Sequence, residues 1–138
     1  MEITVERLPL ATPVAILSTH GDLDASNYLF LIAKAEEVYN EGVHFMVLDL
    51  SDTSFLSSAG LVALHSIALL LRGEQPLDPE SGWDAIQAMD HNLDAGLQKN
   101  LKLLNPQPRV DRTLDRTGLK QFFEIYTDRE SVLASFGA

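Results

Sequence analysis

The sequence predicts one α/β domain built on a mixed, mostly parallel sheet of four to five strands. Two strand-like segments stand at the beginning, and strand-like and helix-like segments alternate after them. Such alternation favours parallel strands joined by helical crossovers, after an initial antiparallel hairpin. The length of 138 residues suits one domain of ordinary size, so we expect a single domain over residues 1–138.

The strands are indicated by their apolar patterns. Segments 2–8 and 14–19 are separated by a proline-framed turn, which predicts a hairpin. Segment 43–50 is almost continuously apolar, as a central strand buried on both faces should be. Shorter strands are expected over 101–105, which prolines close, and over 121–126.

Helices are predicted between these strands and at the end of the chain. The segments concerned are 25–41, 58–73, 109–118 and 127–136. The first helix should start near Ala25, with Asp24 or Ser26 as its cap. The last one starts at a capping box formed by Thr127 and Glu130. The inward face expected of the first helix consists of Leu29, Ile32, Ala35, Glu36 and Tyr39.

The segment 73–100 is a probable insertion that contains an extra helix. Its residues 83–99 space apolar side chains at steps of three and four, which predicts an amphipathic helix with an acidic outer face. Such a helix most often packs on its own domain, and a stripe reserved for a partner is the alternative. The linker-like stretch 73–82 is too short to separate two domains.

Composition and charge disfavour several classes of protein. The chain has a net charge of -10 and no cysteine. It therefore forms no disulfide, and it lacks the basic patches that nucleic acids and anionic membranes require of a partner. We find no apolar run long enough to insert into a membrane and no secretion signal, so a cytoplasmic location is expected.

Motifs for catalysis and nucleotide binding are missing from the sequence. It has no G-x-S-x-G elbow and no glycine-rich phosphate loop, so we expect neither an enzyme nor a cofactor. Aspartates 22, 24, 49 and 52 could hold magnesium if their loops met. Turn formation and helix capping by aspartate is the preferred interpretation, so no metal site is predicted.

The junction "FLSSAGL", residues 55–61, places two hydroxyls where a strand-like run gives way to a helix-like run. The simplest interpretation is that Ser57 or Ser58 caps the helix. A serine at a helix N-terminus also tolerates a phosphate, because free amides and the helix dipole favour negative charge there. The physics of the junction permits phosphorylation without selecting it.

Three stretches of the chain resemble the STAS domain family, of the anti-sigma factor antagonist type. They are "GDLD" at 21–24, "VLDLSDTSFLSSAGLVAL" at 47–64 and "LKLLNPQPRVDRTLDRTGLKQFFEIYTD" at 101–128, in the family's order. The resemblance implies a STAS-like domain that binds proteins rather than catalyses. It also marks 73–100 as an insertion, since a typical member connects the long helix to the next strand with only a few residues.

The resemblance also implies a mechanism. In sigma-regulating members, the unphosphorylated domain binds a switch-type serine kinase that is also the anti-sigma factor. The kinase uses ATP and magnesium to phosphorylate one serine, and a phosphatase restores the binding form. The position of that serine in the family matches Ser58. Many members have aspartate at the position before it, where this chain has a second hydroxyl, so Ser57 is a competing acceptor. The implied partner-binding residues are Asp22, Asp24, Ser54, Ser57, Ser58, Ala59, Gly60 and Leu61.

An alternative from another class is a constitutive STAS subunit of a transport or sensory assembly. In that case Ser58 would only cap a helix, and no phosphate would be found on it. Nucleotide binding by the domain itself is a third and poorer interpretation. The sequence leaves the oligomeric state open.

Overall fold

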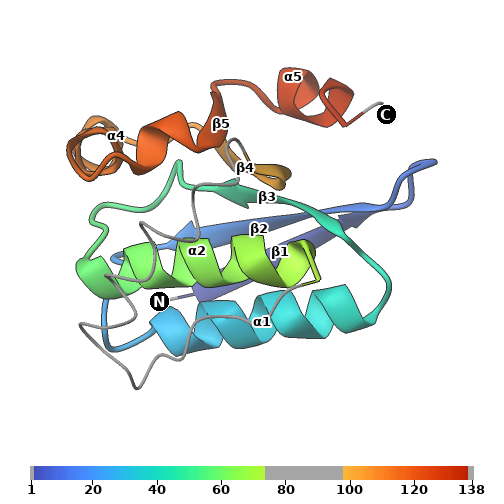
Figure 1. Ribbon diagram of the computed structural model, residues 1–138, viewed down its shortest axis with the longest axis horizontal. Coiled ribbons are helices and arrows are strands. Elements are labelled where there is room, and N and C mark those ends of the chain that lie inside the picture. The colour runs from blue at the N-terminus through green and yellow to red at the C-terminus, as the bar shows by residue number, and fades with distance from the viewer. Residues whose placement is uncertain (1, 74–97, 137–138) are drawn as a thin grey trace.

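The structure is a computed structural model that describes residues 2–73 and 98–136. These residues form a five-stranded sheet in the order β1-β2-β3-β4-β5 (Figure 1). Strand β1 pairs antiparallel with β2, and the remaining neighbours pair in parallel. The predicted hairpin followed by a parallel sheet is therefore confirmed.

The bounds of the elements follow the apolar segments of the sequence. The strands are β1 (Glu2–Leu8), β2 (Val14–His20), β3 (Phe45–Asp49), β4 (Gln98–Leu104) and β5 (Phe123–Tyr126). The helices are α1 (Tyr28–Asn40), α2 (Ser58–Leu71), α4 (Pro108–Arg116) and α5 (Arg129–Ala134), with a 3-10 turn η3 (Leu119–Gln121). None of the helices in this part of the chain has both the length and the apolar character to cross a bilayer.

The larger core lies between the sheet and helices α1, α2 and α4. Alternation along the central strands sends Leu17, Leu48 and Leu103 to this face, and α2 fills the space beneath them. Helix α2 is buried along nearly its whole length, so it packs as an internal element and its N-terminus is fixed in position. Figure 1 shows α1 and α2 side by side on this face.

A smaller core occupies the opposite face of the sheet, under α5. Val132 of α5 packs there with Val47 and Leu104 of the strands. The buried Lys102 also holds α5, because its Nζ donates to Ser135 Oγ at 2.9 Å and lies 4.4 Å from the centroid of the Phe136 ring. The lysine stem contributes apolar contact while its charge has polar partners at the end of the helix.

Helix α1 differs from the prediction in its start and in its inward face. It begins at Tyr28 rather than near Ala25, because the preceding residues form a turn stabilised by the side chains around Asp24. The buried residues are Leu31, Ile32, Ala35 and Val38. Leu29, expected inside, is 51% exposed. The apolar positions with i, i+4, i+7 spacing define the buried stripe, and Leu29 lies off it.

Three further boundaries were predicted incorrectly. The cap of α5 is Asp128, whose Oδ1 accepts from the Ser131 amide at 3.0 Å, so the capping box at Thr127 does not form. Gln121 belongs to η3, which follows Gly118 in a left-handed conformation with φ of 81°, so strand β5 starts later than expected. Strand β4 starts at Gln98, where the extra helix was still expected. The rest of that predicted helix, 83–97, lies outside the described residues.

Candidate functional site

Two loops run side by side where β2 and β3 end. The Gly21 amide donates to the Asp52 carbonyl at 2.9 Å, and the Leu23 amide donates to the Phe55 carbonyl at 2.9 Å. The Leu23 carbonyl then accepts from the Ser57 amide at 3.0 Å. Because parallel strands bring their following loops to the same edge of a sheet, the "GDLD" loop and the start of α2 form one continuous surface.

Side chains fix the bases of both loops. Thr53 Oγ1 donates to the Thr19 carbonyl at 3.1 Å, and both residues are fully buried. Nearer the surface, Asp52 Oδ2 lies 2.6 Å from His20 Nδ1, and His20 Nε2 lies 3.2 Å from Thr4 Oγ1. The loop after β3 is therefore held to β2 by both a buried and an exposed contact.

Gly60 allows α2 to approach the "GDLD" loop closely. A Cβ atom at Gly60 would lie 2.5 Å from Leu56 Cδ1, 3.0 Å from the Leu23 carbonyl oxygen and 3.2 Å from Leu23 Cγ. Carbon atoms in contact normally stand about 3.5–4.0 Å apart. Any other residue would therefore push the first turn of α2 away from the loop.

The two serines have separate roles in the structure. Ser57 is the N-cap residue of α2, with extended backbone, and its Oγ accepts from the Gly60 amide at 3.3 Å. Ser58 is the first residue of the helix and is exposed. Its hydroxyl has no hydrogen bond to any described residue. Ser58 is thus the more exposed of the two serines.

Asp24 is a turn-forming carboxylate at the edge of this surface. Its Oδ1 accepts from the Ser26 amide at 2.9 Å and from Ser26 Oγ at 2.5 Å. The hydrogen bond from the Ser26 side chain, and next the one from its amide, hold the pKa of the Asp24 carboxyl below its usual range. Asp24 is therefore ionised at neutral pH. Asn27 closes the turn, because its Nδ2 donates to the Asp22 carbonyl at 2.8 Å.

Asp49 and Asp52, at and after the end of β3, also have polar partners within the described residues. Asp49 Oδ1 accepts from the Ser51 amide at 3.0 Å, and Asp52 contacts His20. Across residues 2–73 and 98–136, no three histidine, aspartate or glutamate residues gather as a metal site. The contact between Asp49 and Ser51 is that of a turn, whereas Asp52 joins its loop to β2.

The predicted site residues divide by exposure. Asp22, Ser54 and Ser58 are exposed, and Asp24, Ser57 and Ala59 are half-buried. Gly60 and Leu61 are buried. These two residues position the helix, while the other six form the outer surface.

Sequence reasoning missed three neighbours of this surface. The guanidinium of Arg109, in α4, lies 4.9 Å from the centroid of the Phe55 ring. Leu29 and Phe30, in the first turn of α1, are 51% and 70% exposed. No local signal identifies the Arg109 contact, since it joins residues far apart in the chain. Predicting that Leu29 and Phe30 are exposed would have required the correct assignment of the buried face of α1.

Comparison with known proteins identifies the class of protein. The model of the STAS domain family matches residues 4–75, which is slightly more than half of the chain. The chain therefore belongs to the STAS domain family. A search of curated protein sequences gave no match.

Solved structures share the fold over nearly the whole chain. A Thermotoga maritima protein described as a candidate anti-sigma factor antagonist has 20% identity and a TM-score of 0.68, with 99% of this chain and 95% of that chain covered. An anti-sigma factor antagonist from Mycobacterium paratuberculosis has 20% identity and a TM-score of 0.62, with 99% and 96% covered. Unphosphorylated SpoIIAA, also an anti-sigma factor antagonist, has 19% identity and a TM-score of 0.59, with 98% of both chains covered. At these identities the likeness establishes the fold.

Proposed function

We propose that this chain is an anti-sigma factor antagonist regulated by phosphorylation of Ser58. In its unphosphorylated form it binds a serine kinase that is also an anti-sigma factor, and it thereby regulates transcription. We infer a cytoplasmic location for the protein. Phosphorylation ends the interaction, and a phosphatase restores it. The observation that carries the proposal is the separation of the two serines: the Ser57 hydroxyl caps α2, while the Ser58 hydroxyl is exposed and unbonded among the described residues.

The position of Ser58 suits a charged modification. The γ-phosphoryl group of ATP would pass to Ser58 Oγ as its bond to the β-phosphate oxygen breaks and ADP leaves, and the hydroxyl proton would pass to a base of the kinase. The product carries a charge of about -1.5 to -2 at pH 7, next to the amides and the positive dipole end of α2. We therefore expect the phosphate to leave the fold intact.

The ionised Asp24 would reinforce the effect of the phosphate on a partner. Its loop is hydrogen-bonded to the start of α2 through the Leu23 carbonyl and the Ser57 amide, 3.0 Å apart. A partner surface that fits one carboxylate here would meet a second, larger negative charge after phosphorylation. Repulsion between like charges and the cost of desolvating the phosphate would then release the partner.

The proposed contact surface combines polar and apolar parts. Its polar members are Asp22, Asp24, Ser54, Ser57 and Ser58. Ala59 adds a small apolar side chain, and Gly60 and Leu61 hold the surface in place. Phe30, 70% exposed at the start of α1, would add an apolar anchor, because aromatic side chains are enriched among the residues that dominate binding. The whole of residues 1–138 would act as one binding module. The fold is shared with SpoIIAA, which has been solved in unphosphorylated and phosphorylated forms.

The test measures binding of the kinase partner by Ser58 variants. Affinity capture from the source cells, with ATP depleted, would isolate a protein that carries a serine kinase domain. That protein should then bind wild type and Ser58→Ala, bind Ser58→Asp at least about tenfold more weakly, and release wild type when ATP and magnesium are added. Ser57→Ala is the matched control and should still be released by ATP.

Mass mapping of the wild type before and after phosphatase treatment locates the phosphate. A phosphate on Ser58 agrees with the proposal, whereas one on Ser57 moves the acceptor. If wild type, Ser58→Ala and Ser58→Asp bind the partner equally and no phosphate is found, the chain is a constitutive STAS subunit.

A further inference from the structure

Helix α4 carries a stripe of arginines on its outer side. Arg109, Arg112 and Arg116 are all exposed. At 3.6 residues per turn they fall within an arc of about 60°, roughly opposite the buried Val110 and Leu114. Three cations thus share one helix face in a chain whose net charge is -10.

The stripe is not neutralised within the described residues. None of the three arginines forms an ion pair with a described residue, and the guanidinium of Arg109 lies 4.9 Å from the centroid of the Phe55 ring. Asp111 of the same helix pairs with Lys120 at 2.9 Å instead. The charge of Asp115 also acts on Lys120, whose pKa is raised first by its hydrogen bond with Asp111. Asp111 is therefore paired with Lys120, and no ion pair within the described residues neutralises the arginine face.

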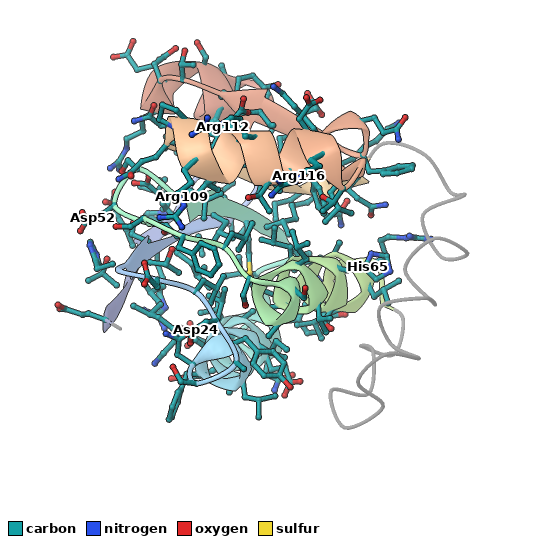
Figure 2. All side chains as sticks on the ribbon, turned by 90° about the vertical axis from the view of Figure 1, so that its left-hand side faces the viewer. Asp24, Asp52, His65, Arg109, Arg112 and Arg116 are labelled. Carbon is teal, nitrogen blue, oxygen red and sulfur yellow. The ribbon has the colours of Figure 1, made fainter. Side chains whose placement is uncertain are left out.

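The stripe adjoins the surface at the start of α2. Gln107, the residue before α4, donates from Nε2 to the Ser51 carbonyl at 2.9 Å, and Arg109 contacts Phe55. Both contacts join α4 to the loop that leads into Ser57. Figure 2 shows the three arginines along α4, at the end of the molecule that also carries Asp24 and Asp52. A partner covering Ser58 would have the arginine face beside it.

We propose that this face of α4 binds an acidic helix of the protein partner, as a second contact beside Ser58. The inference rests on the proposed function, since it takes the partner to be the protein docked at the start of α2. Guanidinium groups match carboxylates in a bidentate fork. A helix with carboxylates at i, i+3 and i+7 would present them over about 10 Å, the rise between Arg109 and Arg116.

Charge favours an acidic protein segment over a nucleic acid or a lipid surface. Only three arginines form the stripe, and the net charge of -10 repels a long polyanion beyond them. A single acidic helix meets the stripe without covering the acidic residues around it. Such a contact is expected to be weak alone and to contribute mainly to orientation and association rate.

The test is an NMR titration of the full chain labelled with nitrogen-15. The probe is an alanine-rich helical peptide with glutamates at i, i+3 and i+7, and the control peptide has the same composition with its glutamates spread around the helix. We expect the first peptide to shift amides of α4 and of the loop at Phe55, saturably and more weakly at higher salt. The scrambled peptide should bind at least about threefold more weakly.

Two charge-reversed variants separate the stripe from net charge. The double variant Arg112→Glu, Arg116→Glu should bind the peptide about tenfold more weakly, since each reversed pair removes an attraction and adds a repulsion. Lys34→Glu with Lys99→Glu makes the same change in net charge elsewhere and should bind like wild type. Equal weakening in both variants, or no shifts of α4 up to about 1 mM peptide, would overturn the proposal.

Other occupants give different outcomes. Stronger binding of a 12-base-pair DNA duplex or of phosphatidylglycerol vesicles to the same amides would assign the face to those ligands and reject the acidic helix. A lower melting temperature of the arginine variant than of the lysine variant would assign the arginines to stabilising their own chain. Ser58→Asp should bind the peptide as wild type does, so failure of the stripe is distinguishable from failure of the Ser58 switch.

Discussion

Replacing Gly60 by alanine should destabilise the domain, although alanine is the better helix former. The added methyl would lie 2.5 Å from Leu56 Cδ1 and 3.0 Å from the Leu23 carbonyl oxygen. Leu56 is 2% exposed and Leu23 fully buried, so neither can move without disturbing the core. Inserting a methyl into a packed core costs about 1–3 kcal/mol, and the intrinsic preference of alanine over glycine offsets about 0.5–1 kcal/mol of it.

The expected net loss is about 1–2 kcal/mol of unfolding free energy. For a domain of this size that corresponds to a decrease in Tm of about 3–8 °C. Urea unfolding followed by circular dichroism measures the change directly. If Gly60→Ala is instead more stable than wild type by about 1 kcal/mol, the close approach of α2 to the "GDLD" loop is wrong.

The same substitution should weaken partner binding beyond its effect on stability. Displacing the first turn of α2 lengthens the hydrogen bond from the Ser57 amide to the Leu23 carbonyl, 3.0 Å in the structure, and shifts Ser58 relative to Asp24. Val132→Ala, in the small core on the opposite face, is a control of similar instability. The control should retain partner binding when compared at a temperature where both variants are folded.

Two further predictions concern the serines and the buried histidine. Ser57→Ala should lower the unfolding free energy by about 0.5–2 kcal/mol because it removes the cap, whereas Ser58→Ala should change it by less than about 0.5 kcal/mol. Urea unfolding measures both changes. Equal losses in the two variants would contradict the assignment of the cap to Ser57. Burial, and secondarily the charge of Arg72, lowers the pKa of the fully buried His65 from 6.5 to about 4, so between these pH values the unfolded chain binds a proton that the folded chain does not. Stability should therefore fall by up to about 3 kcal/mol as pH falls through this window. His65→Leu should remove that part of the slope and add about 1 kcal/mol at pH 7, since neither ring nitrogen has a hydrogen-bond partner among residues 2–73 and 98–136. Parallel pH profiles of urea unfolding in wild type and variant would refute this.

Much of the fold could be predicted from local patterns. The continuous apolar run at 43–50 has the composition of a strand buried on both faces, and β3 is the middle strand of the sheet. The junction at Ser57 is a helix start in both the sequence and the structure, because a serine oxygen can accept from an amide of the first turn. These features depend on residues within a few positions of one another.

The incorrect predictions arose where several local solutions compete. Asp24, Ser26 and Asn27 can each cap a helix, and the choice among them depends on the hydrogen bonds between the "GDLD" loop and the loop after β3. Thr127 and Asp128 are both good caps, and Asp128 is used at α5. Propensity alone does not rank such alternatives, because their free energies differ by only a few tenths of a kcal/mol.

By itself, the sequence determined the elements, the class of fold and the pair of serines at the start of a helix. Only the tertiary structure decided which serine caps the helix, since the cap at Ser57 depends on how Leu23 holds that residue against the helix. Tertiary structure also placed Arg109 against Phe55, in the loop that leads into Ser57. Periodicity along one element records which side is buried, whereas contacts between distant segments depend on how the chain closes around its core.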